Sequence, residues 1–284
     1  MRELAPAKIN LCLLVGPAGA DGLHALVSVM QSITLCDELE LADGECDEVV
    51  CPGVDGPNLV ASAIAAFREA TGWDGPPQRI EIVKRIPVAA GMGGGSADAA
   101  ATLRLLARRS RLPVGDRLLS VAAALGSDVP SQLNPGRVLV SGTGEHVTRL
   151  AEPGTLGVLV LPSRAALSTA AVYTEADRLG GARSADELAA LDPLAMIGVN
   201  DLAAAAQSLE PSIASALVLA RDAGATTAMV CGSGPTAIGL FEDPRAAAGA
   251  AAKLRADGVD AHAARPYPAV ASGLEWGKRA SSHR

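Results

Sequence analysis

The chain of 284 residues is 49% hydrophobic and 19% charged, with a mean hydropathy of +0.27, which supplies one or two cores and excludes a largely disordered chain. Its 24 Lys and Arg residues against 31 Asp and Glu give a net charge of −7, so no nucleic-acid partner is expected. No apolar run approaches the ~20 residues of a membrane span, and the N-terminus lacks the apolar core of a signal peptide. We therefore expect a cytoplasmic protein with no membrane contact.

The first expected strand covers residues 7–15, where aliphatic and polar residues alternate. A period of two is typical of a strand with one buried face, and it places Lys8 and Asn10 on the same face. A second strand over residues 79–88 runs into a glycine-rich stretch. A helix rich in Ala and Leu is expected to follow, up to about Arg109.

The rest of the first half predicts a helix over residues 115–125, which ends at Gly126, and a hairpin over residues 137–150. A short polar break at residues 151–154 then separates two predicted domains, 1–153 and 154–271. A polar tail at 272–284 is expected to be flexible.

The second domain mixes strands with Ala-rich helices. Its expected strands are residues 156–161, 226–231, 236–241 and 259–264, and its expected helices are residues 169–179, 185–191, 201–208, 211–223 and a last one ending near 256. Helices combined with antiparallel strands predict an α+β fold.

The strongest chemical signal is the run Gly91-Met92-Gly93-Gly94-Gly95-Ser96. Glycines allow the backbone to approach a ligand closely, and the helix N-terminus that follows favours phosphate. The alternative is a tight turn with several residues of positive φ. The run is not a P-loop, because no Gly-Lys-Ser/Thr follows, and it is a poor dinucleotide fingerprint, because Ser96 stands where the third Gly or Ala belongs.

Several single residues allow two interpretations each. Lys8 is one of only four lysines among the 24 basic residues, so it is either a phosphoryl-binding ammonium or a strand residue reaching water. Asp128 is either a helix cap or a group that orients or deprotonates a hydroxyl. Asp98 is either a first-turn residue that the helix dipole alone justifies or, as the less favoured interpretation, a direct ligand, and a lone His24 is more often structural than catalytic. The five cysteines form no Cys-x-x-Cys pair, so reduced, mostly buried thiols and no protein-bound metal are expected.

Together these motifs resemble the GHMP small-molecule kinases over nearly the whole chain. The matching segments, in the order typical of that family, are APAKINLCL, DGLHALVSVMQSITLCDEL, IPVAAGMGGGSADAAATL, GSDVP, GTGE, STAAVYTEADRL, Asn200-Asp201-Leu202 and GSGPT. The resemblance implies a two-domain GHMP kinase fold of the α+β class. The N-terminal domain would be like ribosomal-protein S5 domain 2, the C-terminal domain would be ferredoxin-like, and the active site would lie between them.

The resemblance also implies roles for single residues. ATP would bind along Val88, Ala89, Ala90, Gly91, Met92, Gly93, Gly94, Gly95, Ser96 and Ala97. Mg²⁺ would be held mainly by the ATP phosphates and water, with no protein ligand. Asp128 would act on the acceptor hydroxyl as base or orienter, while Lys8 would hold that hydroxyl and the moving phosphoryl charge.

Within the family, the acceptor implied is a cytidine-diphosphate-linked methylerythritol of the non-mevalonate route to isoprenoids. Asn10 would contact this substrate, His24 would read the cytosine edge, and Tyr173 would stack on the ring. Two positions depart from the pattern: Leu23 replaces a Tyr of the cytosine clamp, at a cost of about 1–3 kcal/mol of stacking, and Ser131-Gln132 replaces Phe-Phe at the expected floor of the acceptor pocket. We expect a monomer or weak homodimer.

Three alternatives stay open. Another kinase of the family could act on homoserine or a mevalonate-type acid, which would not require His24 and Tyr173 together. A silent nucleotide sensor would be expected to have lost Lys8 or Asp128, and both are present. A dinucleotide oxidoreductase would need a ribose-reading carboxylate after the glycine run, and none stands there.

Overall fold

The computed structural model describes residues 1–20, 22–54, 56–112, 115–163 and 165–268, so the tail predicted at 272–284 lies outside the described residues. The strands are β1 (Arg2–Ala18), β2 (His24–Asp43), β3 (Glu48–Val50), β4 (Gln78–Val83), β5 (Arg137–Gly142), β6 (His146–Arg149), β7 (Gly157–Leu161), β8 (Thr227–Val230), β9 (Ala237–Phe241) and β10 (His262–Ala264). The helices are α1 (Leu59–Thr71), α2 (Gly94–Ser110), α3 (Gly115–Leu125), α4 (Val129–Gln132), α5 (Thr169–Leu179), α6 (Ala185–Ala190), α7 (Ala203–Leu209), α8 (Ser212–Asp222) and α9 (Pro244–Ala256).

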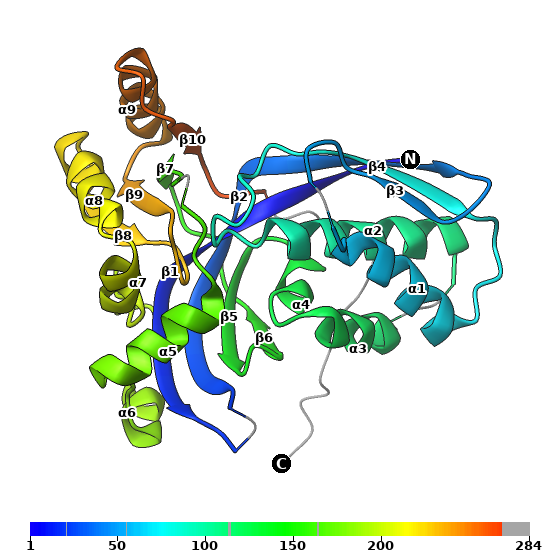
Figure 1. Ribbon diagram of the computed structural model, residues 1–284, viewed down its shortest axis with the longest axis horizontal. Coiled ribbons are helices and arrows are strands. Elements are labelled where there is room, and N and C mark those ends of the chain that lie inside the picture. Colours follow the sequence, from blue (N-terminus) through cyan, green and yellow to red (C-terminus); the bar gives the residue numbers. More distant parts are fainter. Residues whose placement is uncertain (21, 55, 113–114, 164, 269–284) are drawn as a thin grey trace.

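The larger sheet is built around two long antiparallel strands, β1 and β2, which run through the molecule (Figure 1). Its order is β3-β4-β2-β5-β6, with β1 along the other edge of β2. Strands β5 and β4 pair with β2 at residues 26–31 and 38–43 respectively. Helices α1 to α4 cover one face of this sheet, and their apolar sides form a core around Phe67 and Leu103.

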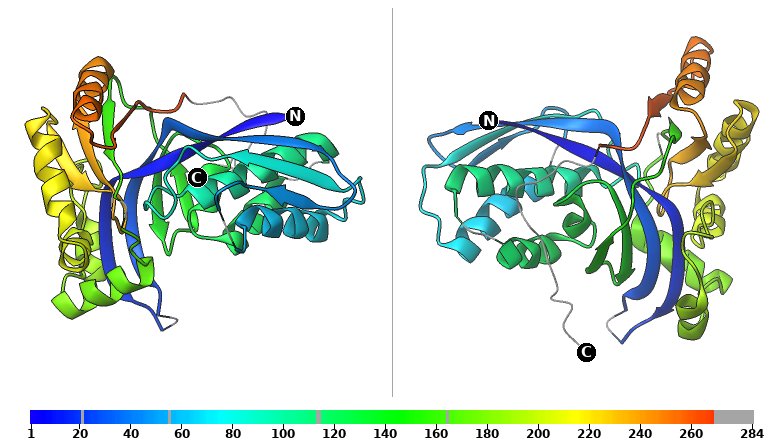
Figure 2. Two further views of the ribbon diagram at one scale, coloured as in Figure 1. Left: turned by 45° about the horizontal axis from the view of Figure 1, so that its top comes forward. Right: turned by 180° about the vertical axis from the view of Figure 1, so that it is seen from behind.

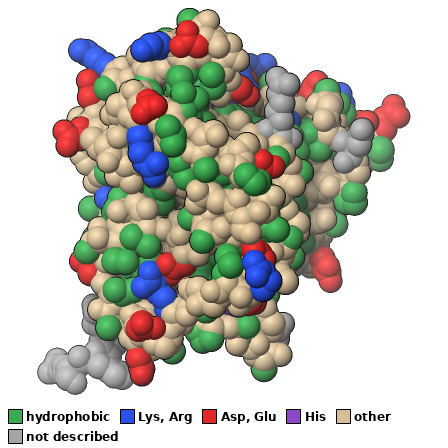
Figure 3. All heavy atoms as spheres, turned by 60° about the vertical axis from the view of Figure 1, so that its left-hand side comes forward, with side chains coloured by type: hydrophobic (Ala, Val, Ile, Leu, Met, Phe, Trp, Pro, Cys, Tyr) green, Lys and Arg blue, Asp and Glu red, His purple; other side chains and the backbone are tan. Residues whose placement is uncertain are grey.

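The smaller sheet has the antiparallel order β10-β7-β9-β8. Counted within the second half of the chain, this is the strand order 4-1-3-2 of a ferredoxin-like unit, so that prediction is confirmed. Helices α8 and α9 pack on one face of the sheet (Figure 2). On their outer side, acidic and basic side chains are interspersed (Figure 3). The predicted boundary at residues 151–154 falls between the two sheets.

The opposite face of the small sheet packs against β1. Ile9 and Leu11 of β1 share a core with Val158 and Ile238 of the second sheet. All residues from 5 to 16 are consequently buried. The prediction of a strand with one solvent-facing side is therefore wrong: the second sheet covers the aliphatic side, and the polar side with Lys8 and Asn10 faces Gly93, Asp128 and Ser28 instead of water.

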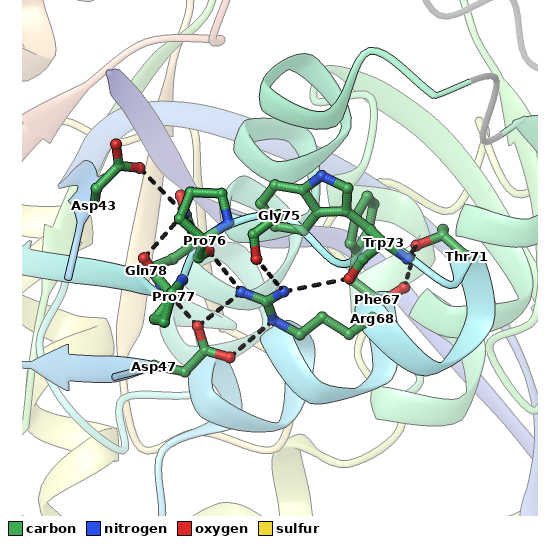
Figure 4. Close-up of polar contacts among 10 residues, drawn as sticks. All are labelled: Asp43, Asp47, Phe67, Arg68, Thr71, Trp73, Gly75, Pro76, Pro77 and Gln78. Atoms are coloured by element: carbon green, nitrogen blue, oxygen red, sulfur yellow. Dashed lines mark hydrogen bonds and ion pairs between the residues drawn. The ribbon is translucent and has the colours of Figure 1, made fainter. Parts of the chain in front are cut away.

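The loop from α1 to β4 is held by Arg68 (Figure 4). Its guanidinium donates to the carbonyl oxygens of Trp73, Gly75 and Pro76 at 3.3, 2.9 and 2.8 Å, and it forms a bidentate ion pair with Asp47 at 2.8 and 3.0 Å. It also lies 4.7 Å over the Trp73 ring. A Cβ on Gly75 would lie 2.3 Å from that ring, so only glycine fits there. This cluster fixes the start of β4, the strand that leads toward the glycine run.

Two of the boundaries that differ from the sequence prediction lie next to the glycine run. Strand β4 ends at Val83 rather than at residue 88, because the backbone N–H groups of Arg85 and Ile86 donate to the Asp37 carboxylate at 2.5 and 2.8 Å instead of to a strand. Helix α2 begins at Gly94, inside the glycine run. Within the ranges given above, no helix is long and apolar enough to cross a membrane.

Candidate active site

Two cavities concern the candidate site, and one of them opens at the start of α2. The first, which we call the loop cavity, has a volume of about 370 Å³ and is lined by the glycine run. The second, the Tyr173 cavity, has about 760 Å³ and lies among β2, α5 and the β5–β6 turn. Both volumes are typical of small-molecule sites.

Most of the residues predicted to bind ATP line the loop cavity. They are Val88, Ala89, Ala90, Gly91, Met92, Gly93, Gly94, Gly95 and Ser96. Ala97 does not line it, because its side chain is fully buried beneath the first turn of α2. The sequence analysis missed a second wall made of Cys51, Val54, Pro57, Asn58 and Leu59. Asn58 caps α1 by accepting from the Val60 N–H at 2.9 Å, but nothing in the sequence joins that helix start to the glycine run.

Two glycines of the run need the left-handed backbone conformation. Gly91 has φ of +74°, and Gly93, the N-cap of α2, has φ of +67°. A Cβ on Gly91 would lie 2.5 Å from the carbonyl oxygen of Gly234, and one on Gly93 would lie 3.0 Å from Lys8 Cγ. A side chain is therefore excluded at both positions by conformation and by space.

The other two glycines, Gly94 and Gly95, belong to the first turn of α2. The amide groups of a first helical turn have no acceptor within the helix, and the helix dipole adds a partial positive charge there. A Cβ on Gly95 would meet nothing within 4 Å, so this backbone faces open space. The arrangement suits a phosphate chain.

Lys8 lies where β1 passes the glycine run, and it is 7% exposed. Its Nζ donates to Asn10 Oδ1 at 3.0 Å and lies 3.3 Å from Asp128 Oδ2. Its backbone N–H donates to the carbonyl oxygen of Met92 at 3.0 Å, which joins strand and loop directly. The structure thus brings Lys8, Asn10 and Asp128 together, although 120 residues of chain separate the first from the last.

Asn10 is completely engaged inside the protein. Its Oδ1 accepts from Lys8, its Nδ2 donates to Ser28 Oγ at 2.8 Å, and it is only 1% exposed. Asn10 lines neither cavity. Lys8 and Asp128 line neither cavity either, so the substrate contact of Asn10 stays a prediction, while its hydrogen bond holds the Lys8 ammonium in position.

The ionic state of Lys8 follows from two opposing effects. Burial, the largest single effect, acts to lower the pKa of its ammonium, but the Asp128 carboxylate together with Cys231 and Tyr173 outweighs burial, and the net pKa is raised. Lys8 is therefore charged and forms an ion pair with Asp128. The capping interpretation of Asp128 fails, because this side chain makes no hydrogen bond to the helix that it precedes.

The loop between β8 and β9 closes the back of the site. A Cβ on Gly232 would lie 3.2 Å from Asn10 Oδ1 and 3.5 Å from Lys8 Nζ. The buried Cys231 thiol reaches the carbonyl oxygens of Lys8 and Gly91 at 3.9 and 3.8 Å. This loop is a connection between antiparallel strands, and it also packs the second domain against the catalytic lysine candidate.

Beneath the glycine run lies an ionic cluster that the sequence did not indicate. Lys84 Nζ pairs with Asp37 Oδ2 at 2.5 Å and with Asp98 Oδ2 at 2.7 Å, and both carboxylates are buried. Lys84 and Asp98 line the loop cavity. Asp98 is not in the first turn of α2, so the dipole explanation is wrong and the ion pair replaces it. Burial raises the pKa of Asp98 to about 7, against the opposing effect of Lys84.

The Tyr173 cavity holds the residues predicted to read a nucleobase. The rings of His24 and Tyr173 lie with centroids 5.1 Å apart at 38°, and Leu23, 56% exposed, lines the same cavity. His24 Nδ1 contacts the carbonyl oxygen of Gly16 at 2.8 Å, and its Nε2 contacts Asp177 Oδ2 at 3.3 Å. Asp177 was missed, although it stands one helical turn after Tyr173.

Ser131 and Gln132, which differ from the family pattern, do not line the Tyr173 cavity. Both side chains are buried in α4, where Ser131 Oγ donates to the carbonyl oxygen of Asp128 at 2.8 Å and Gln132 Oε1 accepts from Ser32 Oγ at 3.2 Å. The cavity is lined instead by Ser127 and Pro130. The expectation that this dipeptide forms the pocket floor is therefore corrected.

Comparison with known proteins places this geometry among the kinases that the motifs resemble. The family model of the GHMP kinases N terminal domain matches residues 58–136, and that of the GHMP kinases C terminal matches residues 181–260. The chain is 41% identical to the 4-diphosphocytidyl-2-C-methyl-D-erythritol kinase of Anaeromyxobacter sp. (strain K), over 89% of this chain and 84% of that protein.

Solved structures of kinases also resemble this chain. A crystal structure of 4-(cytidine 5'-diphospho)-2C-methyl-D-erythritol kinase superposes with a TM-score of 0.79 at 32% identity, covering 94% of this chain and all of that one (100%). Homoserine kinase from Cytophaga hutchinsonii, at 21% identity, a TM-score of 0.63 and 95% of both chains, shares the fold alone.

Proposed function

The chain belongs to the GHMP kinase family, and from this premise we propose its reaction. It transfers the γ-phosphoryl group of ATP to the 2-hydroxyl of 4-diphosphocytidyl-2-C-methyl-D-erythritol. This reaction is a step of the non-mevalonate isoprenoid pathway. The observation that carries the chemistry is the Lys8–Asp128 ion pair, whose members line neither cavity themselves but have neighbours that do. Gly93 lines the loop cavity beside Lys8, while Ser127 and Pro130 line the Tyr173 cavity on either side of Asp128 in the sequence.

ATP fits the loop cavity through the chemistry of its wall. The unpaired first-turn amides of α2 and the open space at Gly95 would receive phosphate oxygens, and Lys84 adds a cation to the same wall. Mg²⁺ would arrive on the phosphates, held by their oxygens and by water, and would neutralise part of their charge.

Transfer of the phosphoryl group depends mainly on the positioning of the reactants and on electrostatic stabilisation. Asp128 Oδ2 orients the acceptor hydroxyl and takes its proton, while the hydroxyl oxygen bonds to the γ-phosphorus and the bond from that phosphorus to the bridging oxygen of ADP breaks. The Lys8 ammonium stabilises the negative charge that moves during this step. Asn10 keeps Lys8 in position through the 3.0 Å hydrogen bond.

The cytidine end of the acceptor would lie in the Tyr173 cavity. Tyr173 would stack on the base and His24 would contact its polar edge, with Leu23 as an aliphatic wall. We propose activity as a monomer or weak homodimer.

The test is ADP release by the purified protein with MgATP and each of three acceptors: the cytidine compound, homoserine and mevalonate. Turnover with the first alone is the expected result, and the Asp128→Asn variant supplies the background rate. Turnover with homoserine or mevalonate alone would overturn the substrate assignment and leave Lys8, Asp128 and the glycine run in their roles. No turnover with any of the three would overturn the proposed function.

A further inference from the structure

The side chain of Asn200 holds the loop between β8 and β9. Its Nδ2 donates to the backbone carbonyl oxygens of Val230 and Gly232 at 2.9 and 2.8 Å, and its Oδ1 accepts from the Leu202 N–H at 2.9 Å, at the start of α7. With the amide turned round, its oxygen would face two carbonyl oxygens, so this orientation satisfies all three contacts. Both N–H donors of the side chain are therefore used on the protein's own backbone.

The backbone on either side of Asn200 is fixed to β1. The Leu13 N–H donates to the Val199 carbonyl oxygen at 2.9 Å, and the Asp201 N–H donates to the Leu13 carbonyl oxygen at 2.9 Å. These bonds pair Asn200 with Leu13 in a parallel bridge. Strand β1 also carries Lys8, so Asn200 connects the β8–β9 loop to the strand of the catalytic lysine candidate.

The loop held in this way lies against the polar groups around Lys8. A Cβ on Gly232 would lie 3.2 Å from Asn10 Oδ1 and 3.5 Å from Lys8 Nζ. The buried Cys231 thiol contacts the carbonyl oxygens of Lys8 and Gly91 at 3.9 and 3.8 Å. Gly232 and Cys231 line neither the loop cavity nor the Tyr173 cavity. Movement of the loop would therefore displace the Lys8–Asn10 pair and leave the walls of both cavities in place.

We propose that Asn200 is a positioning residue for the phosphoryl transfer, because its carboxamide ties the β8–β9 loop to β1 and so holds Lys8 and Asn10 in place. The inference rests on the proposed function. Asn200→Asp keeps the shape of the side chain and its contact with the Leu202 N–H, but it removes the two N–H donors and turns a carboxylate toward two carbonyl oxygens. The variant thus removes the tether and leaves the start of α7 unchanged.

The first experiment measures kcat and the KM values for MgATP and for the cytidine acceptor. Each kcat is given per molecule that binds MgATP in calorimetry, so unfolded protein is not counted. In Asn200→Asp, kcat should fall by about tenfold to hundredfold with both KM values close to those of the wild type, because a small misplacement of reacting groups costs that much. The matched control is Asp243→Ala, which removes the N-cap of α9 in the same domain, where Asp243 accepts from the Arg245 N–H at 2.9 Å. It should lower stability and keep the wild-type kcat.

The second experiment tests the tether without turnover. Maleimide labelling of the folded protein, with the labelled cysteines identified by mass spectrometry, compares Cys231 with Cys36, a buried cysteine of β2. The ratio of the Cys231 rate to the Cys36 rate should rise about tenfold in Asn200→Asp, because the loop opens locally once two hydrogen bonds are lost. Asp243→Ala should keep the wild-type ratio, since global unfolding exposes both thiols.

The outcomes distinguish the two proposals. A wild type that releases no ADP with the cytidine acceptor shows that the proposed function has failed, while the labelling ratio still tests the tether alone. If the wild type turns over and Asn200→Asp keeps its kcat, or loses activity only through KM, the positioning role is refuted. A lower kcat at an unchanged labelling ratio refutes the tether.

A variant without a buried charge covers the case in which Asn200→Asp does not fold. Asn200→Ala removes the two donors without placing a carboxylate against carbonyl oxygens, and the same criteria apply to it. If neither variant shows a cooperative urea transition, the carboxamide is required for the fold itself, and a role in positioning Lys8 is overturned.

Discussion

Replacing Gly95 by alanine separates the structural use of the glycine run from its use for a ligand. Gly95 lies in the first turn of α2, and a Cβ there would meet nothing within 4 Å. Alanine is favoured over glycine in a helix by about 0.5–1 kcal/mol, so Gly95→Ala should fold and be slightly more stable than the wild type. The same methyl group would project toward the space where the phosphates are expected.

The same substitution should lower the affinity for ATP, in contrast to its gain in folding stability. Placing one extra carbon in a filled site costs about 1–3 kcal/mol, which corresponds to roughly a tenfold to hundredfold weaker ATP complex. The matched control is Gly249→Ala in α9, another exposed helical glycine whose Cβ would also meet nothing within 4 Å. It should gain similar stability and leave ATP binding unchanged.

The assay pairs urea unfolding with calorimetric titration of MgATP for both variants. Gly95→Ala should show higher stability together with weaker ATP binding, while Gly249→Ala should show the stability change alone. If Gly95→Ala binds ATP as tightly as the wild type, the phosphates do not lie on the first turn of α2. If both variants lose ATP affinity equally, the effect is not local to the loop cavity.

Three further changes test other parts of the site. Asp128→Asn should lower turnover by about 10²–10⁴-fold with ATP affinity nearly intact, since it removes the proton acceptor and leaves the loop cavity unchanged; lost ATP affinity in a folded variant would contradict this role. Leu23→Tyr should tighten the cytidine acceptor about tenfold by restoring a stacking wall, and an unchanged dissociation constant would show that position 23 does not line a base site. The pKa of Asp98 is raised from 3.8 to about 7, so the folded state retains a proton that the unfolded state has released, and stability falls as pH rises between those two values. Asp98→Asn should flatten this fall in urea unfolding between about pH 4 and about pH 7, and an unaltered slope would contradict the assignment.

The sequence predicted those features that depend on short stretches of chain. The glycine run followed by a helix, the hairpin over residues 137–150 and the alternation of strands with Ala-rich helices in the second half each depend on local spacing, and the structure has all of them. The pairing of Lys8 with Asp128 was implied only by family resemblance, because no local pattern relates residues of β1 to residues before α4. The sequence also could not show which of the four glycines in the run adopt the left-handed backbone conformation, because all four look alike in sequence. In the structure they are Gly91 and Gly93.

Residues that act through long-range ion pairs could not be predicted in this way. Asp37, Lys84 and Asp98 come from the end of β2, the segment after β4 and the helix α2, and each alone looks like an ordinary charged residue. Asp177 likewise contacts His24 only because the fold brings together β2 and α5, which carry these residues 153 positions apart in the sequence. Burial turns such charges into specific contacts, and burial depends on the whole fold.

The placement of Lys8 illustrates how the two halves of the chain determine the site jointly. Strand β1 has register shifts on either side of this region, between Pro6 and Lys8 and between Asn10 and Cys12, and such irregularities re-aim side chains. Ile9, between the two polar residues, is buried against the second sheet. Because the second domain anchors Ile9, the ammonium of Lys8 is held toward the glycine run and Asp128. A change in the packing between the domains should therefore alter catalysis even where it touches no group that contacts ATP or the acceptor.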